Sequence, residues 1–244
     1  MNPIKKFISE RKARIAFQGA DSEFKKQSIE WTKKSMDRDY VYNFEWMGRP
    51  IIQFPQDIMA MQEIIWRTKP DLIIETGIAH GGSIIFSASM LELLGNNGKV
   101  IGIDIDIRDH NRNEIESHPM FKRIELIEGS SVSSEVVAQV QRQAEGKETI
   151  LVVLDSMHTH EHVLKELNAY APLVSKDSYL IVLDTFIEDL PKGYFDNRPW
   201  DVGDNPKTAV HEFLKENTMF EIDQAMERKL MITVAPHGFL KRIA

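Results

Sequence analysis

The chain has 244 residues, no cysteine and a formal net charge of −7. Its hydrophobic and charged fractions, 42% and 27%, are those of a globular protein with a sizeable core. The absence of cysteine excludes a disulfide scaffold, a Cys-ligated metal site and a thiol nucleophile, and the acidic balance lacks the electrostatic footprint of a nucleic-acid-binding protein.

Residues 1–50 form the first predicted unit, a helical N-terminal arm. They contain eleven Lys/Arg and seven Asp/Glu, a balance of +4 that leaves −11 for the rest of the chain. The spacing predicts a helix over 24–34, an extended stretch over 40–46 and a turn over 47–50. The start lacks the apolar core of a signal peptide, and no run of about 18 apolar residues occurs. We therefore expect a cytoplasmic protein without a membrane span.

Residues 51–244 predict a single α/β domain. After a helix over 56–68, five short apolar runs alternate with helical segments. Continuous β-branched runs of this kind are typical of parallel strands buried on both faces. We therefore expect a Rossmann-like, doubly wound sheet. The five runs are Leu72–Ile74, Val100–Ile103, Ile124–Ile127, Ile150–Leu154 and Tyr179–Leu183.

The last part of the chain changes in character. A helix is predicted near 207–216, followed by two apolar runs, 220–222 and 230–234, which we expect to form an antiparallel pair. The segment 186–205 is rich in Pro, Gly and Asp. It is long enough to be a lid or a substrate loop.

A glycine-rich loop, Glu75-Thr76-Gly77-Ile78-Ala79-His80-Gly81-Gly82-Ser83, follows the first strand. Glycines let backbone N–H groups approach a ligand closely, and Asp104, at the end of the next strand, can accept hydrogen bonds from ribose hydroxyls. The glycine spacing does not match the dinucleotide fingerprint, and Glu75 would repel a pyrophosphate, which argues against an NAD-dependent dehydrogenase. An acid suits a ligand with an ammonium group, such as the methionine part of S-adenosylmethionine. The alternative is a turn that only packs helix against strand.

Four stretches carry a resemblance: GRPIIQFPQDIMAMQEIIWRTKPDLIIETGIAHGGS at 48–83, GIDIDIR at 102–108, LDSMHTHEHV at 154–163 and NPKTAVHEFL at 205–214. They resemble the cephalosporin hydroxylase family, which also includes rhamnosyl O-methyltransferases. The resemblance implies a class I S-adenosylmethionine-dependent methyltransferase fold, with a seven-stranded sheet, one antiparallel strand and three helices on each side. It also implies a divalent metal, a homo-oligomer, and methyl transfer to a hydroxyl of a sugar or other small natural product, as in polysaccharide biosynthesis.

The resemblance assigns cofactor-binding residues by position. Asp104 would hold the ribose, and Ser131 would lie near the adenine, as a serine does in the similar catechol O-methyltransferase group. Asp155, at the end of the fourth strand, would border the cofactor as well. The residues expected around the methionine part are Glu75, Gly77, Gly81 and Ser83.

Two aspartates, Asp155 and Asp184, end the fourth and fifth predicted strands. If these strands are neighbours, their carboxyl ends lie roughly 5 Å apart. Two carboxylates that close repel each other unless a cation or a proton intervenes. A hard divalent cation, Mg²⁺, is the simplest answer, with Thr185 adding a third oxygen. The alternative is that each aspartate caps a helix.

The third metal ligand departs from both related patterns. The cephalosporin hydroxylase pattern has a glutamate directly before the second aspartate, where this chain has Leu183. The catechol-type pattern has an asparagine where this chain has Thr185. The candidates for the third ligand are therefore Thr185, Glu188 and His158.

His158 follows Asp155 by three positions, where catechol-type enzymes have a lysine base. A neutral imidazole can take the proton of a hydroxyl whose pKa a metal has lowered. We predict His158 and Asp155 as the catalytic residues, with His160 and His162 packing or supporting. Two alternatives stay open. One is an Fe(II)-dependent hydroxylase that uses His158, His162 and Asp155, and the other is a non-catalytic S-adenosylmethionine-binding subunit.

Overall fold

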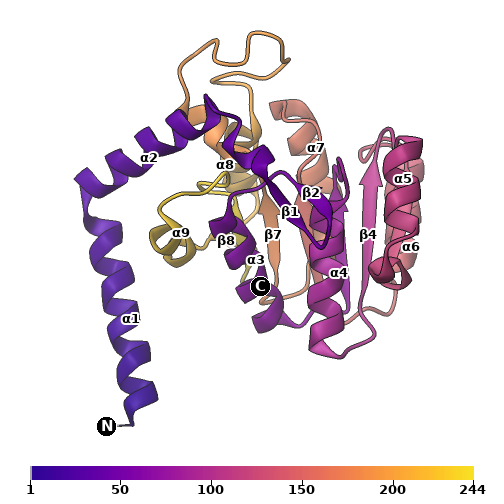
Figure 1. Ribbon diagram of the computed structural model, residues 1–244, viewed down its shortest axis with the longest axis horizontal. Helices are drawn as coiled ribbons and strands as arrows, with labels where there is room; N and C mark the ends of the chain where they lie inside the picture. The colour runs from indigo at the N-terminus through magenta and orange to yellow at the C-terminus, as the bar shows by residue number, and fades with distance from the viewer. Residues whose placement is uncertain (1) are drawn as a thin grey trace.

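The computed structural model describes residues 2–244 and contains a seven-stranded sheet in the order β5-β4-β3-β6-β7-β9-β8 (Figure 1). Strand β9 is antiparallel to both of its neighbours, and the pairings among the first five strands of the sheet are parallel. The predicted doubly wound sheet with one antiparallel strand is therefore confirmed. The strands are β3 (Leu72–Thr76), β4 (Lys99–Asp104), β5 (Ile124–Glu128), β6 (Ile150–Leu154), β7 (Tyr179–Val182), β8 (Phe220–Ile222) and β9 (Phe239–Arg242).

Helices cover both faces of the sheet, three on each side, as expected. Apolar residues of α3, α4 and α5 join one core cluster, and those of α6, α7 and α8 join the other. The central strands β3 and β6 are buried along their whole length, because each supplies side chains to both clusters. The helices are α3 (Pro55–Thr68), α4 (Gly82–Leu94), α5 (Asp109–Glu116), α6 (Ser134–Ala144), α7 (His160–Tyr170) and α8 (Pro206–Glu216). Short 3₁₀ turns are η2 (Pro119–Arg123), η3 (Ala171–Leu173) and η4 (Thr185–Asp189).

The N-terminal segment contains two helices, α1 (Pro3–Ala20) and α2 (Ser22–Met36), and α1 extends away from the sheet (Figure 1). The side chain of Asp21 begins α2 by accepting the Phe24 N–H at 2.9 Å. The stretch expected to be extended over 40–46 is strand only in β1 (Phe44–Trp46), because its first half forms the 3₁₀ turn η1 (Tyr40–Asn43).

Strand β1 pairs with β2 (Arg49–Ile51) as a hairpin, which confirms the predicted turn. The two turn residues, Met47 and Gly48, both have left-handed φ values, 47° and 83°. The predicted boundary between residues 50 and 51 lies inside β2, so the division into an arm and a domain stays a prediction. No helix within residues 2–244 combines the length and the apolar character that a membrane crossing requires.

The expected strand at 230–234 is wrong. The segment from Gln224 to Leu230 forms helix α9, because Asp223 caps it by accepting the backbone N–H groups of Ala225 and Met226 at 3.1 and 3.0 Å. The buried carboxylate of Asp57 then holds the following residues by accepting hydrogen bonds from Thr233 Oγ1 and Val234 N. The antiparallel partner of β8 is β9 instead.

Candidate active site

A cavity of about 700 Å³ lies at the carboxyl edge of β3, β4, β6 and β7. Its walls include most of the residues that the sequence selected: Gly77, Ser83, Asp104, Ser131, Asp155, His158 and Asp184. Carboxyl ends of parallel strands in α/β sheets are the usual place for ligands. Three other predicted residues, Glu75, Gly81 and Thr185, lie behind this wall.

The glycine loop between β3 and α4 lies directly against the end of β6. Gly77 has a φ of 79°, and a Cβ added there would overlap the carbonyl oxygen of Asp155. Its N–H donates to the Ile103 carbonyl at 2.7 Å. Only glycine permits this approach, so Gly77 brings the loop and Asp155 to the same part of the cavity.

Glu75 is fully enclosed beneath the loop, where the Ser83 hydroxyl donates to its carboxylate. Burial raises the pKa of Glu75 to about 8, against the opposing hydrogen bond from Ser83 and with further repulsion from Asp155. The group is therefore largely protonated at neutral pH in this structure. Its expected role beside a cationic ligand stays a prediction.

Asp104 stabilises the glycine loop. Its Oδ2 accepts the N–H groups of Ile78 and Ala79 at 2.9 and 3.3 Å, and its Oδ1 accepts the N–H of Asp106 at 3.2 Å. The carboxylate lines the cavity and keeps lone pairs for a further donor. These contacts do not test whether Asp104 binds the ribose hydroxyls of the cofactor, so that role stays a prediction.

Ser131 belongs to a buried polar network on α7. Its hydroxyl lies 3.1 Å from His162 Nε2, which is 3.5 Å from Oε1 of the fully buried Glu166. Ser156 donates to the same oxygen at 2.7 Å. His162 therefore supports the cavity wall, and it is not among the three side chains that the structure groups as a metal site.

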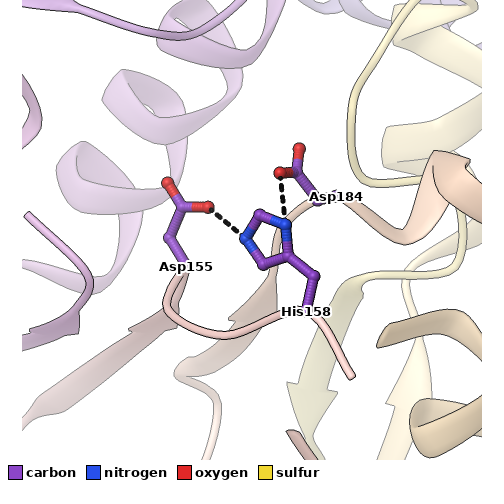
Figure 2. Close-up of side chains that lie close together, drawn as sticks. All are labelled: Asp155, His158 and Asp184. Atoms are coloured by element: carbon purple, nitrogen blue, oxygen red, sulfur yellow. Dashed lines mark ion pairs between the residues drawn. The ribbon is translucent and has the colours of Figure 1, made fainter. Parts of the chain in front are cut away.

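The central feature of the site is a cluster of Asp155, His158 and Asp184 (Figure 2). Strands β6 and β7 are parallel neighbours, with Leu154 paired to Val182, so the two aspartates follow adjacent strand ends as expected. His158 lies between them, with Nδ1 3.0 Å from Asp184 and Nε2 3.6 Å from Asp155. One ligand atom from each residue lies within 4.8 Å of the others.

Charge is concentrated in this cluster. Burial raises the pKa of Asp155 to about 6, against the attraction of the nearby His158 and with repulsion from Asp184. Burial also raises the pKa of Asp184, against the charge of His158. For His158, burial lowers the pKa, but the negative charges of Asp184 and Asp155 outweigh it, so the pKa is raised.

Backbone strain accompanies this arrangement. Asp184 has a φ of 54°, in the left-handed region that side chains seldom adopt. Such strain costs of the order of 1–3 kcal/mol and concentrates at functional sites. Nε2 of His158 is a buried nitrogen without a hydrogen-bond partner in the described chain.

The donor set fits a divalent cation. Two carboxylates with raised pKa values lose their mutual repulsion when a cation binds, and they leave positions for water. Of the three candidates for the third ligand, His158 is the one that lies between the two aspartates, with one ligand atom of each residue within 4.8 Å of the others. The Thr185 hydroxyl donates to the Pro236 carbonyl at 2.7 Å, and Glu188 accepts the Gly203 N–H at 2.8 Å.

Sequence reasoning missed the contribution of the N-terminal segment. Met36, Asp39, Val41 and Tyr42 all line the cavity. No motif marks these residues, because they reach the site only through the packing of the segment against the sheet.

The segment 186–205, expected as a lid, supplies Trp200, whose ring centroid lies 4.7 Å from that of His158. The Tyr194 hydroxyl of the same segment donates to Asp37 at 2.7 Å. This bond joins the segment to the residue that ends helix α2. The aromatic residues of this segment, Tyr194, Phe195 and Trp200, are the sequence signal that could have located this contact.

Comparison with known families gives one family model, Rhamnosyl O-methyltransferase/CmcI, which matches residues 38–243. A Rhamnosyl O-methyltransferase of Mycobacterium leprae is 30% identical over 210 residues, covering 84% of this chain and 86% of the relative. Another, of Mycobacterium bovis, is 29% identical over 222 residues, covering 88% and 80%.

Solved structures share the fold. The apo structure of CmcI-N160 is 18% identical, with a TM-score of 0.58 over 83% of this chain and 77% of that one. An O-methyltransferase from Bacillus cereus in complex with SAH is 15% identical, with a TM-score of 0.52 over 80% and 81%. At these identities the likeness establishes a common architecture.

Proposed function

The chain belongs to the Rhamnosyl O-methyltransferase/CmcI family, and we propose that it is a metal-dependent enzyme that transfers the methyl group of S-adenosylmethionine to a hydroxyl of a sugar or a glycosylated small molecule. The observation that carries the proposal is the cluster of Asp155, His158 and Asp184 in the same cavity as the glycine loop. Both parts of the reaction, donor and activated acceptor, would meet there.

S-adenosylmethionine would occupy the half of the cavity beside β3 and β4. Its methionine part would lie along Gly77, Gly81 and Ser83, above the carboxyl group of Glu75. Asp104 would accept the ribose hydroxyls, and Ser131 would border the adenine. A structure of CmcI-D160 carrying Mg and SAM has the same fold, with a TM-score of 0.58, which supports the choice of cofactor and metal.

Asp155 and Asp184 would hold Mg²⁺ or another divalent cation. When bound, the cation lowers the pKa of a coordinated hydroxyl and orients it. Thr185, the predicted third protein ligand, lies behind the cavity wall with its hydroxyl donating to the Pro236 carbonyl, so water is the better supported third ligand of the proposal. Asp155 also faces the cofactor side, because its carbonyl oxygen packs against Gly77.

His158 would take the proton of the acceptor hydroxyl. Asp184 lies 3.0 Å from Nδ1, so it can hold the proton on that nitrogen and leave the lone pair on Nε2. Nε2 has no other partner in the described residues, and Trp200 packs on the ring. Held in line with the sulfonium, the oxygen would attack the methyl carbon while the carbon–sulfur bond breaks, and alignment supplies much of the rate.

The iron-dependent alternative requires two histidines and one carboxylate on an open face. The cluster contains one histidine and two carboxylates, since His162 bonds to Ser131 and Glu166 instead. Methyl transfer is therefore the better supported reaction. A non-catalytic S-adenosylmethionine-binding subunit would not require the strained, charged cluster of Asp155, His158 and Asp184.

For the acceptor, we propose a saccharide hydroxyl, because the curated relatives are named Rhamnosyl O-methyltransferase. The aromatic residues Tyr194, Phe195 and Trp200 line the cavity beyond the cluster and offer faces for a sugar ring. The proposal keeps the expected polysaccharide biosynthesis, cytoplasmic location and homo-oligomer. Exposed apolar side chains on α1, among them Ile4, Phe7 and Phe17, support self-association.

The test combines labelled S-adenosylmethionine, Mg²⁺ and a panel of rhamnosides, with products detected by mass spectrometry. We expect a methylated rhamnoside from the wild type and none from Asp155→Asn or Asp184→Asn. Both variants should still bind S-adenosylhomocysteine in calorimetry within a few-fold. The exposed Asp106→Asn variant is the control. Full turnover by either cluster variant, or in excess chelator, would exclude the metal role.

A further inference from the structure

A second cavity, of about 540 Å³, lies between α2, α9 and the start of α8 (Figure 1). It shares one lining residue, Phe186, with the cavity described above. Neither the glycine loop nor the aspartate–histidine cluster reaches it. It is therefore a separate space on the other side of η4, roofed by the N-terminal segment.

One face of α2 forms the roof. Lys25, Ile29, Thr32 and Lys33 all line the cavity, and their spacing puts them on the same side of the helix. The neighbouring lysines of the same helix, Lys26 and Lys34, do not line it. The apolar part of the wall consists of Ile29, Phe186, Leu190, Ile222, Met231 and Pro236.

The charges of the wall are unbalanced. Four fixed cations, Lys25, Lys33, Lys207 and Arg228, face two carboxylates. Both carboxylates are already engaged, since Asp189 pairs with Lys207 at 2.6 Å and Glu227 accepts the His237 N–H. Among residues 2–244, no ion pair within 4.0 Å involves Lys25, Lys33 or Arg228. The wall is therefore cationic, although the whole chain carries −7.

Lys207 is the buried member of this set, with 6% of its surface exposed. Burial and then the charge of Lys207 lower the pKa of His237, so the imidazole is neutral at pH 7. Its Nδ1 lies 2.8 Å from His211 Nε2, which leaves Nε2 of His237 for a ligand. The backbone of His237 is also strained, with a φ of 68°.

We propose that this cavity binds a small phosphomonoester with an apolar body. Lysine ammonium groups bind phosphate as point charges, and three of the four cations lack a carboxylate partner. The apolar wall would cover the body of the ligand. Pockets for small organic ligands have volumes of roughly 300–1,000 Å³ and combine an apolar lining with few polar groups, as this one does.

The test uses hexyl phosphate, inorganic phosphate and 1-hexanol as probes, each titrated calorimetrically into the full chain at low ionic strength. We expect hexyl phosphate to bind at least about 10-fold more tightly than either other probe, because charge and apolar area act together. The double variant Lys25→Gln/Lys33→Gln should weaken hexyl phosphate binding by about 10-fold. The matched control Lys26→Gln/Lys34→Gln, on the same helix but outside the cavity, should bind as the wild type does.

Three results would overturn the proposal. Equal losses in the two double variants would mean that the surface charge of α2 acts without the cavity. Equal affinity for inorganic phosphate and hexyl phosphate would remove the apolar part of the site. Competition between hexyl phosphate and S-adenosylhomocysteine would place the probe in the other cavity.

Discussion

At the scale of single residues, His158 lies with one ring nitrogen 3.0 Å from Asp184 and the other 3.6 Å from Asp155. Removing the imidazole should remove the acceptor of the hydroxyl proton and leave cofactor binding intact. We expect His158→Gln to lower kcat by about 10²–10⁴-fold. The affinity for S-adenosylhomocysteine should change less than about threefold, as expected for a loss confined to the transition state.

The exposed His110 on α5 supplies the control, and His110→Gln should retain full kcat. The pH profile adds a second readout, because the variant should lose the acidic limb that protonation of the base produces. A kcat within about twofold of the wild type would contradict the role of His158 as the base.

Glu75 has a folded-state pKa near 8 and an ordinary value of 4.5, so the folded chain holds a proton on it that the unfolded chain releases. Because the pKa of Glu75 is raised on folding, its contribution to the free energy of unfolding is complete below pH 4.5 and is lost as the pH rises to about 8. Glutamine does not ionise, so Glu75→Gln should remove this loss of stability at high pH.

We therefore expect Glu75→Gln to have the higher Tm at pH 8 and a Tm closer to the wild type at pH 5. A difference of one between the folded-state and unfolded-state pKa of a group changes the free energy of unfolding by about 1.4 kcal/mol, which shifts Tm by roughly 3–6 °C in a chain of this size. Thermal unfolding of both proteins from pH 5 to pH 8, with the exposed Glu30→Gln as control, measures this effect. Parallel Tm profiles would contradict it.

At the scale of elements, the contact between the glycine loop and the end of β6 decides whether the cofactor and metal residues share one cavity. An alanine at Gly77 would place its Cβ against the Asp155 carbonyl as well as in a left-handed φ of 79°. Gly95, at the end of α4, has a similar φ of 71° but nothing within 4 Å of an added Cβ.

Gly95→Ala should therefore cost only the backbone strain, about 1–2 kcal/mol. Gly77→Ala should cost about 1–3 kcal/mol more, because backbone must move to make room. It should also weaken S-adenosylhomocysteine binding, which Gly95→Ala should not do. Equal unfolding free energies for the two variants in denaturant would show that β3 and β6 do not need this close approach.

The parallel strands were predictable because each corresponds to a mostly apolar run that is followed by a polar residue, although β5 carries Glu125 within its run. The same rule located Asp104, Asp155 and Asp184 at one edge, and the observed neighbours β6 and β7 confirm the spacing argument for the two aspartates. The strand expected at 230–234 was wrong because Leu230 ends helix α9 and the residues after it are irregular, held by the distant carboxylate of Asp57, a contact that apolar content does not reveal.

At the scale of the whole molecule, contacts between segments distant in sequence complete the site. The sequence did not reveal these contacts. Tyr194 bonds to Asp37 across 157 positions, and residues 36–42 close the cavity. The buried bond between Asp57 and Val234 spans 177 positions. No local pattern encodes such pairs, because their partners are chosen by the packing of the complete fold.

The fold as a whole also sets the pH dependence of metal binding. It buries Asp155 and Asp184 at one point, so protons and a cation compete for the same pair. Because the pKa of Asp155 is raised to about 6 and that of Asp184 is also raised, the pair takes up protons in mildly acidic solution.

We therefore expect the affinity for Mg²⁺ to rise by up to about tenfold per pH unit from pH 5 to about pH 6, the pKa of Asp155, and to rise more slowly at higher pH. Calorimetry in buffers of different ionisation enthalpy should detect proton release in the acidic range and little release at pH 8. Asp184→Asn should bind Mg²⁺ at least about tenfold more weakly at pH 8, since one charged ligand is gone. Asp106→Asn, with both cluster carboxylates intact, should follow the wild-type curve. An affinity that stays constant from pH 5 to 8 would mean that the cation binds elsewhere.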